Sequence, residues 1–262
     1  LKEEGILMAA SYQLDPWKLG YQTSAYTQIM LADSKQHRLV EKEFLAAANV
    51  PLASFHSVES QQELDTAVEL IGFPCVLKTR RFGYDGKGQI ILKSKDQAVG
   101  AFSELGGGAC VLEMFVPFFA ETSLIAARGL DGTVSSYEMA LNTHENHILK
   151  TTELPSGLPN QVLAEAGSLA NTILNKLDYV GVMGIEFFIA GTRDNPLLLV
   201  NEIAPRVHNS GHWTQAGASV SQFELHVRAV SNIDFPIIEQ SGNSMMINLI
   251  GDPLDSRWYV NE

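Results

Sequence analysis

Apolar residues recur at the spacing of an amphipathic helix in several stretches of the chain. A capping box, Ser60 with Glu63, precedes one of these stretches, and Gly72 ends it. A proline, Pro51, follows another closely and cannot continue a helix. We therefore expect helices in four segments, residues 38–48, 61–71, 96–104 and 162–177.

Shorter apolar runs bounded by glycine, proline or asparagine predict strands. Two pairs of runs have the pattern of a hairpin: residues 75–79 with 90–93, and residues 184–189 with 197–203. Because hairpins favour antiparallel sheets, we expect an α+β fold rather than a doubly wound parallel sheet. Further strands are expected at residues 110–114, 122–128, 134–141 and 148–152.

The composition is that of an ordinary folded protein. The chain has 262 residues and a mass of 28.7 kDa, with 45% hydrophobic and 18% charged residues, which excludes disordered and fibrous classes. Its net charge of −12 argues against a protein that coats nucleic acid, so an anionic ligand must be met by local cations. No apolar run approaches the ~18 residues of a membrane helix. Cys75 and Cys110 are expected to be reduced, buried thiols, as in a cytoplasmic protein.

Two glutamates, Glu186 and Glu202, lie in the strands of the second predicted hairpin. If the turn is centred on Asp194, both are equally distant from it and face each other on one side of the sheet. Directly opposed like charges destabilise a sheet, and a cation between them would remove that cost. The pair therefore predicts an oxygen-ligand site for Mg²⁺, to which Asn201 could add an oxygen. The alternative is that both side chains point to solvent.

The turn of the first predicted hairpin is rich in glycine and in basic residues. Its glycines let the backbone approach a phosphate, and positive charge comes from Lys78, Arg80, Arg81 and Lys87. The turn lacks the Walker pattern and joins two strands, where a Walker loop would open a helix. Alone it could equally be a basic hairpin tip, but beside a Mg²⁺ site it favours binding of a nucleoside triphosphate.

A polar run, residues 201–214, follows the second hairpin directly. Zinc binding by His208 and His212 is disfavoured, because their spacing needs a helix that the intervening Ser-Gly does not favour and no third ligand is adjacent. Several of its side chains can instead bond an anion or an amine, which predicts a binding loop. These side chains are Arg206, His208, Asn209, Ser210 and His212.

Several motifs of the chain occur together in one known family. They are Lys-Thr-Arg-x-x-Gly-Tyr-Asp-Gly-Lys-Gly-Gln at 78–89, Glu-x-Phe-Val at 113–116 with Glu121 and Ser123, and Asn-Glu-Ile-Ala-Pro-Arg-Val-His-Asn-Ser-Gly-His-Trp-Thr at 201–214. With these motifs the chain resembles the ATP-grasp carboxylate-amine ligases, and among them the enzymes that carboxylate aminoimidazole ribonucleotide in purine biosynthesis. The resemblance implies a fold of two lobes with antiparallel sheets that clasp ATP between them.

The resemblance also implies roles for individual residues. Arg38 and Lys78 would hold the ATP phosphates, and Glu121 would bind the ribose hydroxyls. Glu186 and Glu202 would carry Mg²⁺. The backbone of Glu113, Met114, Phe115 and Val116 would read adenine, His144 and Asn201 would lie against the nucleotide, and Gly83, Tyr84, Asp85, Gly86, Lys87, Gly88 and Gln89 would form a lid over the phosphates.

The implied reaction is phosphorylation of bicarbonate by ATP and Mg²⁺, followed by carboxyl transfer from carboxyphosphate to the amine of aminoimidazole ribonucleotide. The catalytic residues would be Arg206, His208 and Asn209, at the bicarbonate end, and Lys87. Cations and Mg²⁺ neutralise charge that develops during phosphoryl transfer, and a closed lid keeps water from a labile acyl phosphate. A homodimer is expected from the same resemblance.

We expect four parts in the chain: an unassigned segment, 1–37, that would be the remnant of an N-terminal domain; a small lobe, 38–112; a large lobe, 113–235; and the start of a C-terminal segment, 236–262. The glycine-rich start and basic end usual in the family are not found, so the sequence is expected either to be truncated or to omit stretches of the protein. Two alternatives remain open. One is another ATP-grasp ligase, such as a formate-dependent glycinamide ribonucleotide transformylase or a biotin-carboxylase relative, and the other is an ATP-binding module without turnover.

Overall fold

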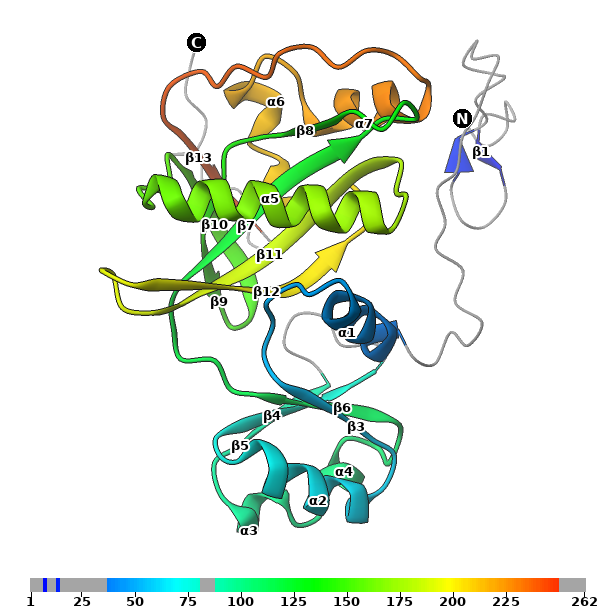
Figure 1. Ribbon diagram of the computed structural model, residues 1–262, viewed down its shortest axis with the longest axis vertical. Helices are drawn as coiled ribbons and strands as arrows, with labels where there is room; N and C mark the ends of the chain where they lie inside the picture. The colour runs from blue at the N-terminus through cyan, green and yellow to red at the C-terminus, as the bar shows by residue number, and fades with distance from the viewer. Residues whose placement is uncertain (1–6, 9–12, 15–36, 81–87, 250–262) are drawn as a thin grey trace.

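The computed structural model describes residues 37–80 and 88–249, together with residues 7–8 and 13–14. The described residues form a smaller and a larger sheet with helices packed on them, one lobe above the other in Figure 1. Strands pair antiparallel throughout both described sheets. The predicted α+β class is therefore confirmed. A separate antiparallel pair joins β1 (Leu7–Met8) and β2 (Gln13–Leu14).

The smaller sheet has the strand order β3-β6-β4-β5, and its helices pack on one face. Alternate strand residues such as Leu77 and Leu112 point into this core, where they meet Leu64 and Val68 of α2. These buried side chains thus form a hydrophobic core of the smaller lobe, separate from that of the larger sheet. The elements of the smaller lobe are β3 (Phe55–Val58), α2 (Gln61–Ile71), β4 (Cys75–Thr79), β5 (Gln89–Leu92), α3 (Lys95–Ala98), α4 (Ala101–Glu104) and β6 (Cys110–Met114).

Local sequence signals set the helix ends in this lobe. Ser60 Oγ accepts from Glu63 N at 3.2 Å, and Glu63 Oε2 accepts from Glu59 N at 2.7 Å, so the predicted cap of α2 is present. The single helix expected over 96–104 is wrong. Gly100 adopts a left-handed conformation with φ 79° and divides the segment into α3 and α4.

The larger sheet has the strand order β12-β11-β7-β9-β10-β13, with β8 paired to β7. One face packs on α5 through residues such as Ile173, Met183 and Phe187, and the other packs on α7 through Leu225 and Val182. Its elements are β7 (Phe118–Arg128), β8 (Val134–Ser136), β9 (Ala140–Glu145), β10 (Ile148–Leu154), α5 (Asn160–Lys176), β11 (Gly181–Gly191), β12 (Pro196–Ala204), η2 (Asn209–Gly211), α6 (Thr214–Gly217), α7 (Gln222–Val230) and β13 (Ser244–Ile247).

The single strand expected over 134–141 is also wrong. It is divided into β8 and β9 at Tyr137, whose side chain is buried and whose hydroxyl donates to Val220 O at 2.9 Å. A buried phenol needs such a partner. The amide of Tyr137 still donates to Ile125 O of β7 at 2.9 Å, and strand pairing resumes at Ala140.

The two sheets divide the chain a few residues later than the expected boundary. Glu113 and Met114 still pair within the smaller sheet, and β7 begins at Phe118. The helix α1 (His37–Ala47) precedes the smaller sheet in sequence, yet its Leu45 is buried in the core of the larger one. At the other end, β13 pairs with β10 and extends the larger sheet.

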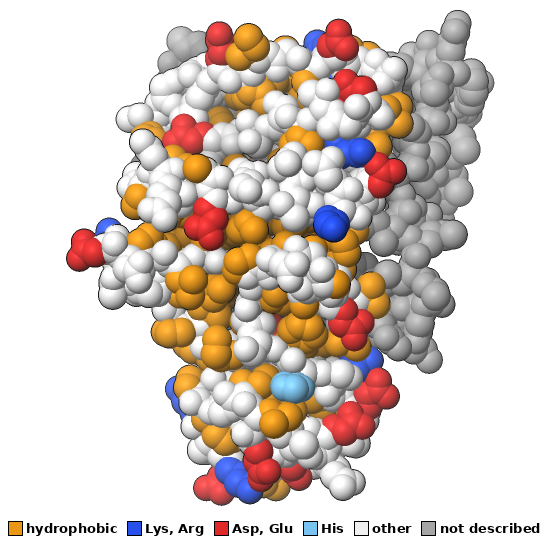
Figure 2. Space-filling view, in the orientation of Figure 1, with side chains coloured by type: hydrophobic (Ala, Val, Ile, Leu, Met, Phe, Trp, Pro, Cys, Tyr) orange, Lys and Arg blue, Asp and Glu red, His pale blue; other side chains and the backbone are white. Residues whose placement is uncertain are grey.

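Hydrophobic side chains gather where the two lobes meet, beside the β11–β12 hairpin (Figure 2). The start of β7 exposes Phe118 and Phe119 to 39% each, and the hairpin exposes Leu197 to 52%. No helix among the described residues is long and apolar enough to cross a membrane.

Candidate functional site

A cleft of about 950 Å³ lies between the two lobes. That volume is at the upper end of the range found for small-molecule sites. The smaller lobe and α1 contribute cationic side chains, and the larger sheet contributes carboxylates and histidines. Of the predicted site residues, the cleft is lined by Arg38, Lys78, Gln89, Glu113, Glu121, His144, Glu186, Asn201, Glu202, Arg206, His208 and Asn209.

Glu186 and Glu202 are direct cross-strand partners, as predicted. The register near the turn pairs Gly191 with Pro196, and its continuation would pair Glu186 with Asn201. A β-bulge at Asn201 inserts one residue into β12 and moves Glu202 opposite Glu186. The predicted pair is therefore correct, although the bulge that produces it was not foreseen.

The pKa of Glu186 is shifted by the groups around its carboxyl group. Burial, followed by the charge of Glu202, raises the pKa of Glu186 to about 7. The positive charge of His144 and a hydrogen bond from the Asn201 side chain act in the opposite direction. A divalent cation placed against both glutamates would compensate the two charges together.

The donor set fits Mg²⁺ better than zinc. Within the described part of the chain, no group of three or more His, Cys, Asp or Glu side chains could hold a metal. Mg²⁺ at nucleotide sites is commonly bound by one or two carboxylates, with phosphate oxygens and water completing its coordination. The ring of His212 stacks on Phe223 at 5.7 Å between centroids, which also disfavours a zinc site with His208.

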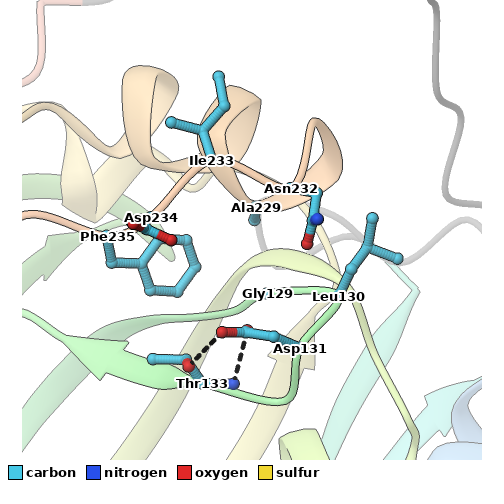
Figure 3. Close-up of a pocket in the computed structure, with 9 residues that line it drawn as sticks. All are labelled: Gly129, Leu130, Asp131, Thr133, Ala229, Asn232, Ile233, Asp234 and Phe235. Atoms are coloured by element: carbon cyan, nitrogen blue, oxygen red, sulfur yellow. Dashed lines mark hydrogen bonds between the residues drawn. The ribbon is translucent and has the colours of Figure 1, made fainter.

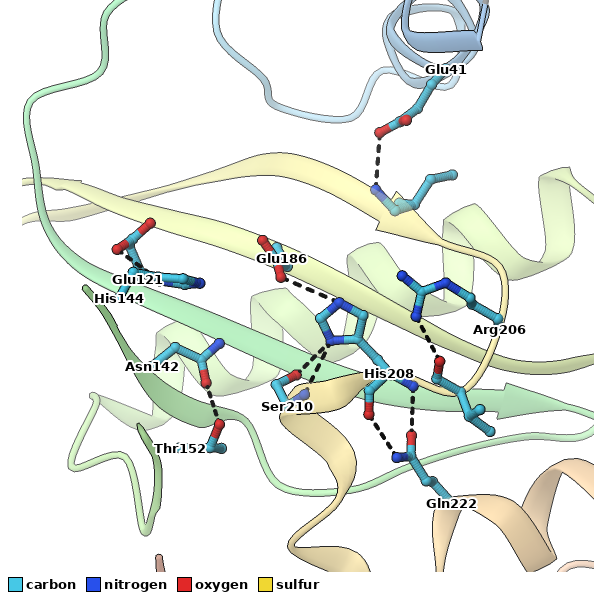
Figure 4. A network of polar contacts seen from close by, with 12 residues as sticks. Glu41, Glu121, Asn142, His144, Thr152, Glu186, Arg206, His208, Ser210 and Gln222 are labelled. Carbon is cyan, nitrogen blue, oxygen red and sulfur yellow. Dashed lines mark hydrogen bonds and ion pairs between the residues drawn. The ribbon is translucent and has the colours of Figure 1, made fainter. Parts of the chain in front are cut away.

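A second acidic group lies farther along the same face of the larger sheet. His144 Nδ1 lies 3.0 Å from Glu121 Oε2 (Figure 4). Burial opposes the charged imidazole, but the hydrogen bond and charge of Glu121, with Glu186 and Glu202, raise the pKa of His144. The imidazolium thereby neutralises part of an otherwise acidic wall.

Two lysines and one glutamate form the opposite wall. Glu113 Oε2 lies 3.0 Å from Lys78 Nζ and 3.3 Å from Lys42 Nζ. Burial disfavours the carboxylate, yet the two ammonium groups lower the pKa of Glu113, while burial lowers the pKa of Lys78. One carboxylate between two lysines leaves net positive charge, which suits a phosphate chain.

Arg80 does not contribute to this cationic wall, contrary to the sequence analysis. Its guanidinium is 2% exposed and donates to Cys110 O at 3.1 Å, Glu59 Oε1 at 3.0 Å and Ser57 Oγ. These contacts point back into the smaller lobe, so Arg80 anchors the end of β4 and is not available to a ligand.

His208 reaches back from the end of β12 onto β11 (Figure 4). Its Nε2 lies 3.4 Å from Glu186 Oε1, and its Nδ1 accepts from Ser210 N at 3.4 Å. Burial, followed by the charge of Arg206, lowers the pKa of His208 to about 4. The ring is therefore neutral at pH 7, and we assign its hydrogen to Nε2, which donates to Glu186.

A glycine makes this approach possible. A Cβ added to Gly184 would lie 2.7 Å from both Cβ and Cγ of His208. Such a distance is far inside van der Waals contact, so the His208 ring occupies the space a side chain would need. The position of the ring over β11 thus depends on the absence of a side chain at residue 184.

Gln222, which the sequence analysis did not single out as a site residue, fixes the backbone of His208. Its Nε2 donates to His208 O at 2.7 Å, and its Oε1 accepts from His208 N at 2.9 Å. Its own N donates to Thr214 Oγ1 at 2.9 Å. All three residues are buried. The run Ser-Gln-Phe-Glu at residues 221–224, whose serine caps α7, is a sequence signal that could have drawn attention to Gln222.

The other residues of the polar loop lie at the cleft opening. Arg206 is exposed, and its Nη1 donates to Val207 O at 2.9 Å. Asn209 begins the short helix η2 beside it. Both side chains line the cleft next to His208 and can approach an anion there.

Some predicted residues lie elsewhere. Gly83, Tyr84, Asp85, Gly86 and Lys87 are outside the described residues. Gly88 accepts through its O from Thr79 N at 2.8 Å. Met114 ends β6, and Phe115 and Val116 lie in the link between the sheets, where Val116 is buried with Leu199. None of these three residues is among those that line the cleft.

Several residues that line the cleft were not predicted, among them two on α1 and one on β11. Glu41 and Lys42 extend into it from α1, and the ring of Phe188 on its wall stacks on Phe118 at 4.5 Å between centroids. Phe188 carried a visible signal, since alternation in β11 places it on the same face as Glu186. The charges on α1 carried none, because a helix with polar residues on one side is normally solvated there.

A second cavity, between the turn 129–133 and the end of α7, is too small for a substrate (Figure 3). Its volume is about 20 Å³, close to that of a single water molecule. Asp131 at its rim accepts from Thr133 N at 2.9 Å and Thr133 Oγ1 at 2.7 Å. This cavity is therefore not a candidate substrate site.

Known proteins are similar to this chain in both sequence and architecture. The N5-carboxyaminoimidazole ribonucleotide synthase of Pseudomonas aeruginosa is 48% identical over 214 residues, which cover 82% of this chain and 58% of the relative. The crystal structure of N5-carboxyaminoimidazole ribonucleotide synthetase from Thermus thermophilus superposes with a TM-score of 0.77 at 41% identity, covering 84% of this chain and 58% of that one.

A further solved structure contains ligands. The N5-carboxyaminoimidazole synthase of Aspergillus clavatus, in complex with ADP and 5-aminoimidazole ribonucleotide, has a TM-score of 0.76 at 28% identity and covers 84% of this chain and 58% of that one. The present chain thus spans less than two thirds of the length of these relatives. The sequence profile of the ATP-grasp domain matches residues 43–223, more than half of the chain. The chain belongs to the ATP-grasp family.

Proposed function

We propose that this chain is the ATP-binding and carboxyl-activating part of an enzyme that makes 5-(carboxyamino)imidazole ribonucleotide. Bicarbonate would be phosphorylated by ATP to carboxyphosphate, and the carboxyl group would then pass to the exocyclic amine of aminoimidazole ribonucleotide, leaving ADP and phosphate. The observation that carries the proposal is the opposed pair Glu186 and Glu202, in a cleft that also presents Lys78 and the buried His208.

Mg²⁺ is the metal that this donor set favours. Glu186 and Glu202 would hold it, with Asn201 as a neighbouring oxygen donor. When bound, Mg²⁺ would neutralise charge on the ATP phosphates. The protein side chains would meanwhile fix the direction from which bicarbonate approaches.

ATP would lie between the two walls of the cleft. Lys78, with Arg38, would hold phosphate oxygens beside the Glu113 carboxylate, and Glu121 would accept from the ribose hydroxyls with His144 adjacent. The backbone of residues 113–116 would read the adenine edge. The segment from Gly83 to Gln89 would cover the phosphates as a lid.

The neutral His208 would donate from Nε2 at the bicarbonate end of the cleft. Arg206 would supply positive charge, and Asn209 would orient the carboxyl group before transfer. Lys87, together with Tyr84 and Asp85 of the lid, would complete the catalytic set when the second substrate is bound. Excluding water is essential at this point, because carboxyphosphate hydrolyses readily.

The remaining parts of the proposal concern the setting of the enzyme. We place it in the cytoplasm as a homodimer, with small-molecule partners and neither nucleic acid nor membrane as a ligand. The net charge of −12 disfavours binding of a polyanion beyond the nucleotide.

The test is ADP release from MgATP by the full chain, with and without bicarbonate and aminoimidazole ribonucleotide. Release should require bicarbonate, rise with the ribonucleotide and vanish in Glu202→Ala, while Glu165→Ala on the exposed face of α5 should behave as wild type. Release that ignores the ribonucleotide would favour another ATP-grasp ligase. ATP binding without any release would favour a binding module without turnover.

A further inference from the structure

The strand that carries Glu202 lies at the edge of the larger sheet. β12 is the first strand in the described sheet order, so its outer side faces no further strand of that sheet. Residues 51–52 cover one part of this side, where Val200 N donates to Pro51 O at 2.8 Å and Leu52 bridges to Val200. Beyond that point the backbone of β12 must find other partners.

Two side chains of α1 provide those partners. Lys42 Nζ donates to Asn201 O at 2.7 Å, and Ile203 N donates to Glu41 Oε1 at 2.9 Å. Figure 4 shows Glu41 extending from α1 down to the backbone of β12. In an extended strand, the carbonyl before a residue and the amide after it point to the same side. The two contacts therefore flank Glu202 and leave its own amide and carbonyl directed toward β11.

This position matters because of the bulge. Asn201 is the inserted residue, and a bulge locally disrupts the ladder that would otherwise hold the strand. Glu202 must also stay opposite the like-charged Glu186. Without an external constraint, the strand could relax by separating the two carboxylates.

We propose that Glu41 and Lys42 are positioning residues, which clamp the backbone on both sides of Glu202 and hold its carboxylate in the geometry that binds the divalent cation. The inference rests on the proposed function, because it assigns these residues a role at the metal site of that function. Lys42 is well fixed for the task, since it is 4% exposed and also forms an ion pair with Glu113 on the same wall of the cleft.

Comparing Glu41→Met with Glu41→Gln distinguishes the loss of the hydrogen bond from Ile203 N from the loss of the negative charge. Both variants remove the negative charge, but only glutamine keeps an oxygen that can accept from Ile203 N. Glu43, an exposed neighbour on the same helix, provides the control Glu43→Met. The first readout is the affinity of the full chain for Mn²⁺ in the presence of ADP, from the free-Mn²⁺ electron paramagnetic resonance signal.

We expect the Mn²⁺ dissociation constant to rise tenfold or more in Glu41→Met, with most of the affinity restored in Glu41→Gln and wild-type affinity in Glu43→Met. The second readout is amide hydrogen exchange. The segment 201–204 should exchange faster in Glu41→Met than in wild type, whereas the core strand β7 should be unaffected. Lys42→Met, which leaves Glu113 paired with Lys78 at 3.0 Å, should weaken Mn²⁺ binding as well.

Three results would overturn the clamp. An equal loss of Mn²⁺ affinity in Glu41→Gln and Glu41→Met would mean that Glu41 acts through its charge or as a metal ligand, and not through the backbone of β12. Wild-type Mn²⁺ affinity in a folded Glu41→Met would make its contact dispensable. Unchanged exchange over 201–204 would show that the contact does not hold the strand. If wild type itself binds no Mn²⁺ with ADP, the proposed function fails, and the exchange data still decide whether Glu41 fixes β12.

Discussion

The side-chain amide of Gln222 bonds both backbone groups of His208, donating to its carbonyl at 2.7 Å and accepting from its amide at 2.9 Å. We expect Gln222→Met to break both bonds. The buried His208 amide then has no partner, while its carbonyl keeps the bond from Gly211 N at 3.0 Å. One unsatisfied buried amide and one lost hydrogen bond to the carbonyl together cost roughly 2–4 kcal/mol of unfolding free energy. Urea denaturation measures the change, and ADP release should fall with it.

The matched control for this variant is Gln215→Met, at an exposed position of α6 close by. It should change the unfolding free energy by less than about 0.5 kcal/mol, the usual range for surface substitutions. Equal effects of the two substitutions would mean that the amide contacts of Gln222 do not support the His208 loop.

Gly184 provides a second test of the position of His208. Gly184→Ala places a methyl group 2.7 Å from Cβ and Cγ of the ring, so the ring must move away from Glu186. We expect loss of most bicarbonate-dependent ADP release and a destabilisation of about 1–3 kcal/mol, typical of overpacking. Steady-state assays and thermal unfolding would report the two effects.

Gly167→Ala controls for the loss of a glycine. Gly167 lies within α5, and an added Cβ would meet no atom within 4 Å. Alanine should therefore stabilise the helix by about 0.5–1 kcal/mol and leave ADP release intact. An active Gly184→Ala enzyme would show that His208 need not lie against β11.

Much of the fold and half of the site could be read from the sequence because they depend on local patterns. The capping box of α2 and the strand β4 follow from neighbouring residues alone. The pair Glu186 and Glu202 followed from counting along one hairpin, although the count succeeded only because the bulge at Asn201 compensates a turn centred half a residue earlier than assumed.

The remainder depends on contacts between distant segments. Glu41 meets Ile203 across more than half of the chain, and nothing in the sequence around α1 distinguishes it from the solvated Glu43. Arg80 shows the reverse case. A basic residue beside a glycine-rich turn predicts a phosphate contact. In the structure, however, the Arg80 guanidinium donates to three acceptors within the smaller lobe.

Arg80→Met should therefore lower the unfolding free energy and leave the affinity for the nucleotide nearly unchanged. We expect a loss of roughly 2–4 kcal/mol of unfolding free energy, because Cys110 O and Ser57 lose a buried partner. The affinity for ADP, measured by calorimetry on the folded fraction, should change less than about threefold, equivalent to ~0.7 kcal/mol. Lys78→Met should instead weaken ADP binding strongly and change the unfolding free energy little. A large loss of ADP affinity in Arg80→Met would show that Arg80 contacts the phosphates after all.

The raised pKa of Glu186 makes divalent-cation binding dependent on pH. In the metal-free protein, burial and Glu202 raise its pKa to about 7, so below pH 7 the group carries a proton that a cation must displace. Mn²⁺ affinity should therefore fall about tenfold per pH unit as the pH drops below 7, and level off above it.

Isothermal titration in buffers of different ionisation enthalpy should show close to one proton released at pH 6 and almost none at pH 8.5. Glu165→Gln, at an exposed helical position, should keep this profile. Glu186→Gln should weaken binding at every pH and abolish the proton release, whereas release that persists in Glu186→Gln would assign the titrating group to another residue of the cleft.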